Sequence, residues 1–283
     1  MTVLLWGSTA DAVVTAVGDA LGAIGVETLV TDSADEMPIV LDGDTLLAGD
    51  RRIDLDGVTG VLVRPSQADN IELHAALAAW TETTTAVVLN RLSASASNRS
   101  KPYQLGRLRD IGFALPDTIV TTDPSFVWEF IGRHPHVIYK STSGVRSIVK
   151  MFAAEDQERI DSISACPTQF QQYIDGTDIR VHVIGRDLFA VRIDSAAVDY
   201  RYGHPIDEPL RMEPTILPAA TAAMCLAAVD ELGLQLAGID LRIDPRGRCW
   251  CFEINTAPGF IWFEQHAGQP IAASIARRLA GRH

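Results

Sequence analysis

The fold prediction for this chain starts from residues 238–255, which read GIDLRIDPRGRCWCFEIN. In the middle of this stretch, residues 244–247 read Asp-Pro-Arg-Gly, a combination that is typical of a tight turn. The segments on either side therefore fold back on each other as two strands. The sequence predicts a β-hairpin with its turn at Pro245 and Arg246.

Strand alternation sorts the side chains of this hairpin onto two faces. The predicted apolar face carries Ile239, Leu241, Ile243, Trp250, Phe252 and Ile254. The other face carries Asp240, Arg242, Cys251, Glu253 and Asn255. If Asp244 pairs with Gly247, Asp240 lies opposite Cys251 and diagonal to Glu253, with Cβ atoms roughly 7 to 8 Å apart. Two carboxylates at that separation reach one divalent ion between them.

The oxygen ligands on this face predict which ion binds. Oxygen-only ligands select a hard cation such as Mg²⁺, which usually joins one or two carboxylates to substrate phosphates. Asp240 and Glu253 therefore indicate a nucleotide site. The alternative is a solvated acidic face, the default for any single acid, and the neighbouring motifs argue against it.

A lysine and a small-residue loop supply the features expected around phosphates. Lys140 closes an apolar strand, 137–140, just before the loop 141–147, which reads STSGVRS and includes Ser143 and Gly144. The backbone N–H groups and hydroxyls of such a loop cover phosphates, and the lysine adds a point charge. Alone, such a pattern is more often an edge charge beside a plain hairpin turn, and Lys101 alone is more often a residue in the first turn of a surface helix.

A second polar pair follows an extended segment, 171–174, that turns at Gly176 and enters another strand. Asp178 and Arg180 share one face of that strand. An acid suits ribose hydroxyls and an arginine suits phosphate oxygens. A cross-strand surface ion pair explains the same residues equally well.

The length of 283 residues predicts two or three subdomains around one cleft. We expect an N-terminal α/β domain over 1–92, a central subdomain over 93–170 and a C-terminal subdomain over 171–283. The first holds strands at 3–6, 26–30 and 60–64, helices at 11–24 and 70–82, and a polar hairpin at 39–53. Residues 91–100, rich in Ser, Asn and Arg, are expected to be a linker.

Alternation and helix-ending glycines predict the rest of the chain. The expected helices are 101–111, 125–132, 219–232 and 269–279. The expected strands are 118–121, 137–140, 147–150, 169–174, 178–184 and 188–193. Only a short hairpin is expected between Ser195 and Asp199, and residues 202–218 carry no recognisable motif.

Composition excludes several classes of protein. No apolar run is long enough to span a membrane, and no basic segment precedes residues 3–6 as in a signal peptide. A net charge of −12 without a Lys/Arg stripe argues against nucleic acid as a partner. The four cysteines lack metal or redox spacing, so we expect buried free thiols in a reducing cytoplasm.

Taken in order, these motifs resemble the ATP-grasp superfamily over roughly residues 93–280. The resemblance rests on Lys140, the segments 171–174 and 176–180, Gly238-Ile239-Asp240, and residues 253–259, which read EINTAPG. Within the superfamily, the chain is similar to the ligases that add glutamate to a ribosomal protein tail and to glutathione synthetases. The implied fold is α/β (α+β), an ATP-grasp fold with an N-terminal pre-ATP-grasp domain.

The resemblance implies ATP and Mg²⁺ as cofactors and a role for each matching residue. Phosphate binding is implied for Lys101, Lys140, Ser143 and Gly144; adenine binding for Gln171, Tyr173 and Ile174; ribose binding for Asp178; and Mg²⁺ binding for Asp240, Glu253 and Asn255. Arg180 and Lys140 would stabilise an acyl phosphate. The chain carries Gln171 where many relatives have glutamate, and Thr256-Ala257 where the tail-modifying ligases have two serines.

The implied reaction is ADP-forming ligation of a small-molecule or peptide carboxylate to an amine or hydroxyl in the cytoplasm, and a homo-oligomer is one assembly open to the chain. A further likeness is to the ATP-grasp enzymes that cyclise ribosomal peptides through side-chain esters and amides, and it rests on residues 193–195, 199–201 and 260–264. Intramolecular cyclisation of a small molecule is a related alternative. A nucleotide-binding regulatory protein without turnover and a structural α/β protein are the rivals from other classes.

Overall fold

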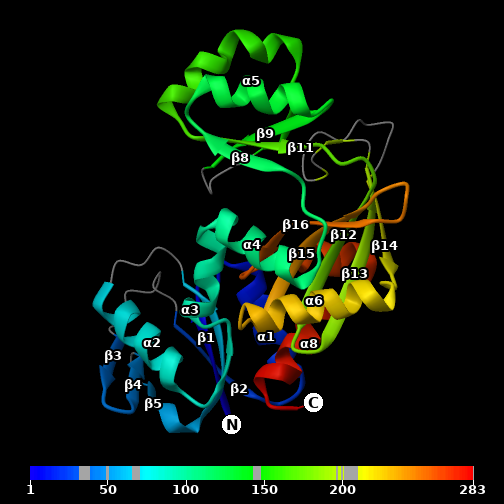
Figure 1. Cartoon of the computed structure of the whole chain (residues 1–283). Helices are drawn as coiled ribbons and strands as arrows, with labels where there is room; N and C mark the ends of the chain where they lie inside the picture. The colour runs from blue at the N-terminus through cyan, green and yellow to red at the C-terminus, as the bar shows by residue number, and fades with distance from the viewer. Residues whose placement is uncertain are drawn as a thin grey trace.

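Three groups of strands, which form four sheets among the described residues, make up the mixed α/β architecture shown in Figure 1, and helices pack around them. The computed structural model describes residues 1–31, 39–48, 51–65, 71–142, 148–195, 197–198, 200 and 210–282. Ser143 and Gly144 lie outside these residues. The order of strands along the chain keeps the three groups nearly separate in sequence.

The N-terminal part is built on a parallel sheet of order β2-β1-β6-β7. Its strands are β1 (Thr2–Gly7), β2 (Glu27–Val30), β6 (Val58–Arg64) and β7 (Val87–Leu89), with helices α1 (Ala12–Ala23) and α2 (Ile71–Thr83). Asp11 begins α1 by accepting a hydrogen bond from the backbone N–H of Val13 at 2.9 Å. The expected strand-helix-strand unit is therefore confirmed.

The predicted polar hairpin at 39–53 is a three-stranded antiparallel sheet instead. Its strands are β3 (Ile39–Asp42), β4 (Thr45–Ala48) and β5 (Arg51–Asp54), followed by the short helix η1 (Leu55–Gly57). The middle strand, β4, pairs antiparallel with both neighbours, so the segment forms two strand pairs where one was expected.

The predicted linker at 91–100 is helical: α3 (Leu92–Ser95) and η2 (Ala96–Arg99) lead directly into α4 (Lys101–Ile111). Contacts with the preceding helix explain the difference. The backbone N–H and hydroxyl of Ser93 both donate to the Glu82 carboxylate, at 3.0 and 2.6 Å, and so satisfy the start of α3. Gly112 ends α4 in the left-handed region at φ 105°, as expected.

A separate lobe contains the antiparallel sheet of order β10-β9-β11-β8. Its elements are β8 (Thr118–Thr121), α5 (Pro124–Arg133), β9 (Val137–Ser141), β10 (Lys150–Met151), η3 (Ala154–Ala165) and β11 (Thr168–Gln172). A small core that includes Val127, Phe130 and Phe170 holds α5 and η3 against the sheet. In the described part of the strand expected at 147–150, Ile148 and Val149 lie outside any strand, and Lys150 pairs with β9 together with Met151.

The C-terminal part carries a five-stranded antiparallel sheet of order β14-β13-β12-β15-β16. Its elements are β12 (Thr177–Ile184), β13 (Asp187–Asp194), β14 (Arg211–Thr215), α6 (Ala219–Glu231), β15 (Leu236–Ile243), β16 (Cys249–Asn255), α7 (Ile261–Ala267) and α8 (Ile271–Leu279). The expectation of a short hairpin between Ser195 and Asp199 is wrong, because the strand that pairs with β13 begins only at Arg211. The motifless stretch before α6 therefore contains β14.

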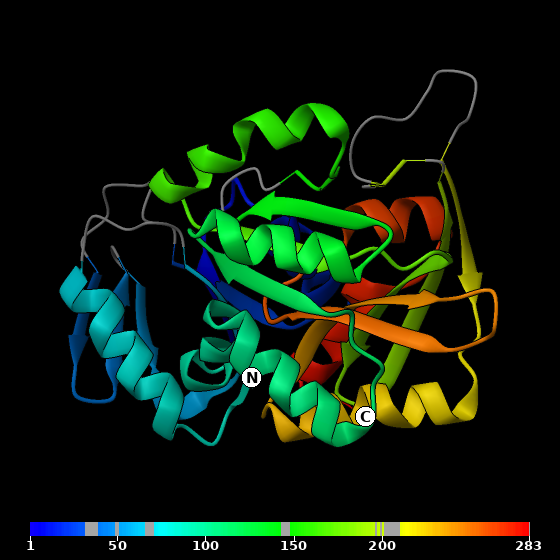
Figure 2. The ribbon, with the colours of Figure 1, turned by 45° about the horizontal axis from the view of Figure 1, so that its top comes forward.

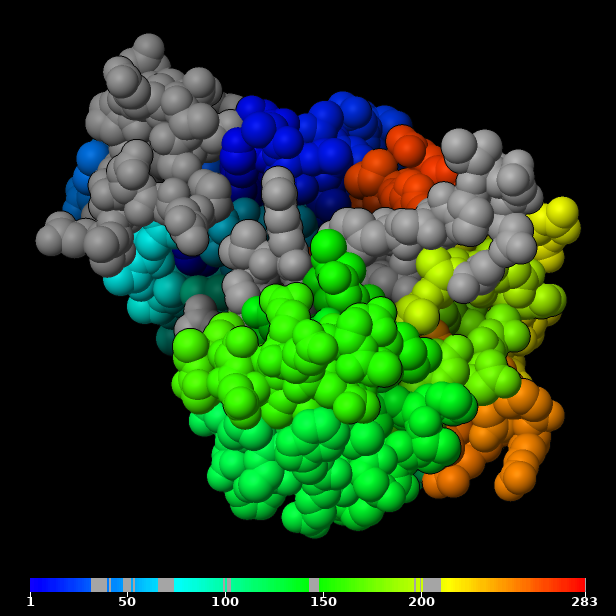
Figure 3. Space-filling view, turned by 90° about the horizontal axis from the view of Figure 1, so that it is seen from above, coloured from blue at the N-terminus to red at the C-terminus, as the bar shows by residue number. Residues whose placement is uncertain are grey.

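The C-terminal helix α8 packs against the N-terminal part of the chain. It packs on α1 and β6, in a core that combines Val3, Leu5, Leu236, Ile275 and Leu279. Figure 1 shows the lobe standing above this joined body, and Figure 2 shows the β15–β16 hairpin next to the lobe. Seen from above, the green surface of the lobe faces the viewer, and α7 lies beside the N-terminal residues behind it (Figure 3).

Two predictions from composition, on membrane spans and on cysteines, can be compared with the structure. None of the described helices is long and apolar enough to cross a membrane. All four cysteines are free thiols, but Cys166 is exposed, which contradicts the expectation that all of them are buried.

Candidate active site

A cleft of about 1060 Å³ lies between the sheet of the lobe and the C-terminal sheet. This volume is at the upper end of the roughly 300–1,000 Å³ that is usual for ligand pockets. Eight of the predicted site residues line it: Lys140, Gln171, Tyr173, Asp178, Arg180, Asp240, Glu253 and Asn255. Ile174 is buried beside it, at 5% exposure. The structure does not describe the side chain of Lys101 at the start of α4.

The predicted hairpin is present, but its register differs from the expected one. Asp240 pairs directly with Glu253, and Leu241 pairs with Cys251, so Phe252 is an extra residue in a β-bulge. The bulge puts Phe252 on the cleft side with Glu253 and puts Cys251 in the core at 0% exposure. The expected faces of Phe252 and Cys251 were therefore wrong.

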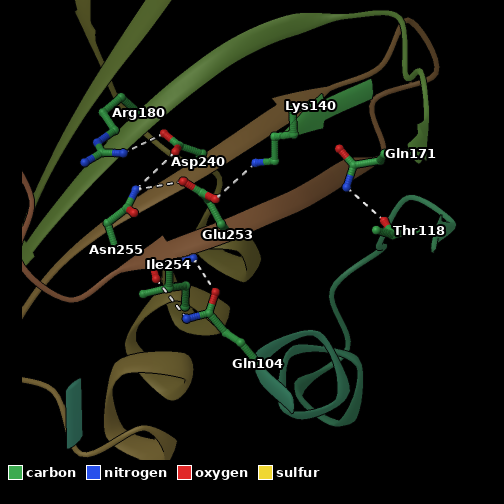
Figure 4. A network of polar contacts seen from close by, with 9 residues as sticks. All are labelled: Gln104, Thr118, Lys140, Gln171, Arg180, Asp240, Glu253, Ile254 and Asn255. Carbon is green, nitrogen blue, oxygen red and sulfur yellow. Dashed lines mark hydrogen bonds and ion pairs between the residues drawn. The ribbon is translucent and has the colours of Figure 1, made fainter. Parts of the chain in front are cut away.

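Two contacts on the outer edge of β16 explain the bulge. The backbone N–H of Cys251 donates to the Ala114 carbonyl at 2.9 Å. Three residues later, the N–H of Ile254 donates to the Gln104 side-chain oxygen at 2.9 Å, and Gln104 donates back to the Ile254 carbonyl at 2.8 Å (Figure 4). Because N–H groups on one edge of a regular strand are two residues apart, a spacing of three requires one extra residue.

Asp240, Glu253 and Asn255 converge at this point of the cleft (Figure 4). The Asn255 side-chain amide donates to Asp240 Oδ2 at 3.4 Å and to Glu253 Oε1 at 3.2 Å. Among the described residues, no group of three His, Cys, Asp or Glu side chains could hold a metal ion. Two carboxylates and one side-chain amide therefore meet at this position, and carboxylate and amide oxygens suit Mg²⁺ in combination with phosphate oxygens.

Two cations flank the carboxylate pair. Arg180 donates from Nη1 to Asp240 Oδ1 at 2.7 Å, and Lys140 Nζ lies 3.7 Å from Glu253 Oε2. Burial alone would lower the pKa of Arg180, but the Asp240 carboxylate outweighs it and the pKa is raised, so the guanidinium stays charged. Gly238 makes room for it, because a Cβ at this position would overlap the Arg180 guanidinium and Pro258.

Asp178 and Arg180 share a face of β12, as expected, but each pairs with a residue of β15 opposite it. Arg242 donates from Nε to Asp178 Oδ1 at 2.7 Å and from Nη2 to Asp178 Oδ2 at 2.8 Å. The cross-strand ion pairs that were the competing explanation are therefore present. They line the cleft and are mostly buried, with Asp178 16% and Arg242 11% exposed.

Residues 171–174 leave the lobe sheet and cross to the C-terminal sheet. Gln171 donates through Nε2 to the Thr118 hydroxyl at 2.9 Å, which ties β11 to β8 (Figure 4). The Tyr173 N–H donates to the His136 carbonyl at 3.0 Å, and the Ile174 carbonyl accepts from Arg242 at 2.7 Å. This segment is thus held by both sheets.

Four residues near the site were not singled out by the sequence: Arg242, His182, Gln104 and Asn90. His182 follows Arg180 on the same face of β12, and Arg180 Nε lies 3.4 Å from its Nε2. That i, i+2 spacing was a usable signal for His182. The contacts of Gln104 and Asn90 join residues about 150 positions apart, and no local sequence pattern predicts them.

Comparisons with known proteins agree with this geometry. Residues 96–279 match the family described as RimK-like ATP-grasp domain. A probable alpha-L-glutamate ligase of Sodalis glossinidius (strain morsitans) is 27% identical over 208 residues, which are 69% of this chain and 70% of that protein.

Two solved structures match almost the whole chain. The ATP-grasp ligase PsnB, complexed with minimal precursor, Mg and ADP, is 27% identical with a TM-score of 0.83 and covers 99% of this chain and 96% of its own. The macrocyclase MdnC from Microcystis aeruginosa MRC, bound with precursor peptide MdnA, has a TM-score of 0.86, 21% identity, and covers 99% of this chain and 100% of its own. At that identity MdnC shows the fold alone.

Proposed function

The chain belongs to the RimK-like ATP-grasp family of ligases, and we propose that it forms ADP by activating a carboxylate as an acyl phosphate. An amine or another nucleophile then takes the acyl group. The observation that carries this proposal is the direct pairing of Asp240 with Glu253 between Lys140 and Arg180. Two acids and two cations at one point of a cleft suit phosphoryl transfer, which depends on positioning and charge neutralisation.

Asp240, Glu253 and Asn255 would hold Mg²⁺. The amide nitrogen of Asn255 lies between the two carboxylates, and a half-turn of the amide would present its oxygen to an ion there. Held by these residues, Mg²⁺ would supply positive charge that offsets the charge of the phosphates. Mg²⁺ fits this position because the three side chains converge there and because they carry oxygen ligands.

The remaining residues take roles in binding and orientation. Lys140 would neutralise the transferred phosphate, and Arg180, fixed by Asp240, would stabilise charge on the carbonyl or phosphate oxygen. Gln171, Tyr173 and Ile174 would bind adenine and Asp178 would bind ribose. Lys101, Ser143 and Gly144 are proposed to contact the phosphates.

The second candidate is intramolecular ligation of a ribosomal precursor peptide. It is favoured by the likeness to PsnB, which was solved with its precursor, is 27% identical to this chain and covers 99% of it. The cleft also carries an aromatic wall, with the Tyr200 and Trp262 rings parallel and their centroids 6.3 Å apart.

We propose the cytoplasm as the site of action, with no nucleic acid partner, in keeping with the net charge of −12.

Substitution of the paired acids tests the proposed site. Asp240→Asn and Glu253→Gln should each lower the rate of ADP release by about 100-fold or more, because each removes a carboxylate charge that would hold Mg²⁺ against the phosphates. The rate is measured with ATP, Mg²⁺ and a panel of amino acids, dipeptides and peptides. Asp230→Asn removes an exposed acid that pairs with Arg186, and this control should keep full activity. An active Asp240→Asn/Glu253→Gln double variant would refute the assignment.

Isotope and mass analysis separate the two candidates. A carboxylate labelled with ¹⁸O should pass one labelled oxygen to the released phosphate if an acyl phosphate forms. Ligation of two molecules gives a product heavier than either substrate. Cyclisation gives a product lighter than the peptide by one water.

A further inference from the structure

Arg64 connects the N-terminal sheet to residues 257–259, the loop that follows the β15–β16 hairpin. It is the last residue of β6, and its Nη1 donates to the Ala257 carbonyl at 3.2 Å and to the Pro258 carbonyl at 3.4 Å. All three residues of the loop line the cleft. One side chain of the N-terminal part therefore holds two successive carbonyl groups at the cleft wall.

The order of the N-terminal sheet explains why a residue at this point reaches the cleft. From β1 the chain continues through α1 to β2 on one side, and from β6 it continues through α2 to β7 on the other. Open α/β sheets usually bind ligands at the carboxyl ends of two strands whose connections lead to opposite sides in this way. In this protein Arg64 extends from that position to a loop of the same chain.

Asp11 fixes the guanidinium of Arg64. Nε of Arg64 donates to Asp11 Oδ2 at 2.6 Å, and Asp11 Oδ1 accepts from the Val13 N–H at 2.9 Å, at the start of α1. The pair is mostly buried, with the Arg64 side chain 17% and the Asp11 side chain 29% exposed. Because a charged donor strengthens a hydrogen bond, Arg64 holds the two loop carbonyls more firmly than a neutral side chain would.

The loop lies beside Arg180, the residue proposed to stabilise charge on the carbonyl or phosphate oxygen. The Arg180 guanidinium and Pro258 both lie against Gly238, where an added Cβ would overlap them. The Gly259 carbonyl lies 3.3 Å from His182 Nε2, which in turn lies 3.4 Å from Arg180 Nε. The loop therefore approaches Arg180 at two points, one at Gly238 and one through His182.

The helix that follows the loop makes a third contact with Arg180. The Phe263 ring of α7 is 7% exposed, and its centroid lies 5.5 Å from Cζ of Arg180. A shift of the loop would move this ring as well, because α7 begins at Ile261, two residues after the loop. A displaced loop would thus change the surroundings of Arg180 without removing its ion pair with Asp240.

We propose that Arg64 is a positioning residue for the ligation reaction. By holding the Ala257 and Pro258 carbonyls, it keeps the loop, and through the loop Arg180, in the orientation that the reacting carboxylate requires. Small displacements of a group that acts on the transition state slow a reaction strongly. This inference rests on the proposed function, because that function gives Arg180 its role. It assigns the N-terminal part of the chain a role in catalysis.

Arg64 should affect the rate of the reaction and not the binding of nucleotide. Asn255, the proposed metal ligand before the loop, is held separately, because it pairs with Gly238 and because Asn90 donates to the Thr256 carbonyl at 2.6 Å. Arg64→Met should therefore lower kcat for ADP release by about tenfold or more and leave the KM for ATP within about twofold of the wild type.

Two measurements on the full chain test this role. The rate of ADP release is measured with ATP, Mg²⁺ and the panel of amino acids, dipeptides and peptides. Hydrogen exchange followed by mass spectrometry reports on residues 257–263 without any substrate. In Arg64→Met, exchange over these residues should become about tenfold or more faster, because exchange follows local opening. Arg64→Lys keeps the charge but not the planar fork, and its kcat should return to within about threefold of the wild type.

The matched control is Arg52→Met on β5, in the same part of the chain. Arg52 is exposed, and its Nη2 lies 3.4 Å from the Thr45 hydroxyl, so this variant should keep the wild-type kcat and the wild-type exchange over 257–263. Thermal unfolding of each variant establishes that it is folded. Isothermal titration with ADP and Mg²⁺ establishes that it still binds nucleotide.

The outcomes separate the two hypotheses. If folded Arg64→Met keeps the wild-type kcat or the wild-type exchange over 257–263, the role of Arg64 is refuted and the proposed function stands. Loss of ADP binding together with kcat also refutes it, because the damage is then general and not confined to Arg180. If the wild type releases no ADP with any member of the panel, the proposed function itself fails, and the exchange experiment shows only whether Arg64 holds the loop.

Discussion

His182 shows how one buried residue supports the charge at the site. Its side chain is 0% exposed, its ring lies 5.1 Å from that of Phe263, and its Nε2 lies 3.3 Å from the Gly259 carbonyl. Burial first, and then the charge of Arg180, lower the pKa of His182 well below its ordinary value. A neutral imidazole can lie against the guanidinium of Arg180, whereas an imidazolium would repel it.

The pKa of His182 predicts a dependence of stability on pH. The unfolded chain binds a proton at this histidine below about pH 6.5, while the folded chain does not, so stability should fall as pH decreases from 6.5 toward the folded pKa. The slope from this one group is at most about 1.4 kcal/mol per pH unit. Urea unfolding between pH 7.5 and 5 should show a shallower decline for His182→Gln. Equal slopes for the variant and the wild type would contradict the prediction.

At the scale of the elements, the β15–β16 hairpin is set by its neighbours as well as by its own turn. Gln104 on α4 and Ala114 after it hold the outer edge of β16, and their spacing places the bulge at Phe252. Without the bulge, Asp240 would lie opposite another residue. The pairing of Asp240 with Glu253 therefore depends on α4, which is far from both in sequence.

Replacement of Gln104 tests this dependence. Gln104→Leu leaves the N–H and carbonyl of Ile254 buried without partners, and the free energy of unfolding should drop by roughly 2 kcal/mol or more. ADP release should slow, because Glu253 is no longer fixed against Asp240. Gln265→Leu, at an exposed position on α7, is the control for urea unfolding and activity. A Gln104→Leu protein as stable and active as this control would show that the bulge is set by β16 itself.

At the scale of the molecule, the N-terminal sheet is structurally part of the site. Asn90, just after β7, donates to the Leu236 and Thr256 carbonyls at 2.6 Å each and accepts from the N–H of Leu236 at 2.9 Å. These contacts hold the start of β15 and the residue after β16. Arg64, at the end of β6, donates to the Ala257 carbonyl at 3.2 Å. The shared core with α8 makes the two parts one body.

Close packing of α8 on β6 predicts the effect of a single methyl group. A Cβ at Gly60 would overlap the backbone of Leu279, so Gly60→Ala should force α8 away and cost about 1 to 3 kcal/mol. Scanning calorimetry should show a lower Tm for both parts together. The control is Gly57→Ala, where an added Cβ meets no atom within 4 Å. An unchanged Tm for Gly60→Ala would mean that α8 is not docked as described.

The sequence by itself determined the turn at 244–247, the glycine that ends α4 at Gly112, and the strands that carry Lys140, Asp178 and Arg180. These follow from turn chemistry and from alternation, which act between neighbours in the chain. The resemblance of the ordered motifs to the ATP-grasp superfamily was likewise available from the sequence, and the family match agrees with it.

Only the tertiary structure decided the bulge at Phe252, the pairing of Arg242 with Asp178, and the attachment of the hairpin to α4 and β7. Each depends on which backbone group of one element faces which side chain of another. Residues about 150 positions apart come into contact only after the sheets have packed, and no local sequence pattern predicts such contacts. The turn is therefore a property of the sequence, whereas the geometry of the two acids is a property of the fold.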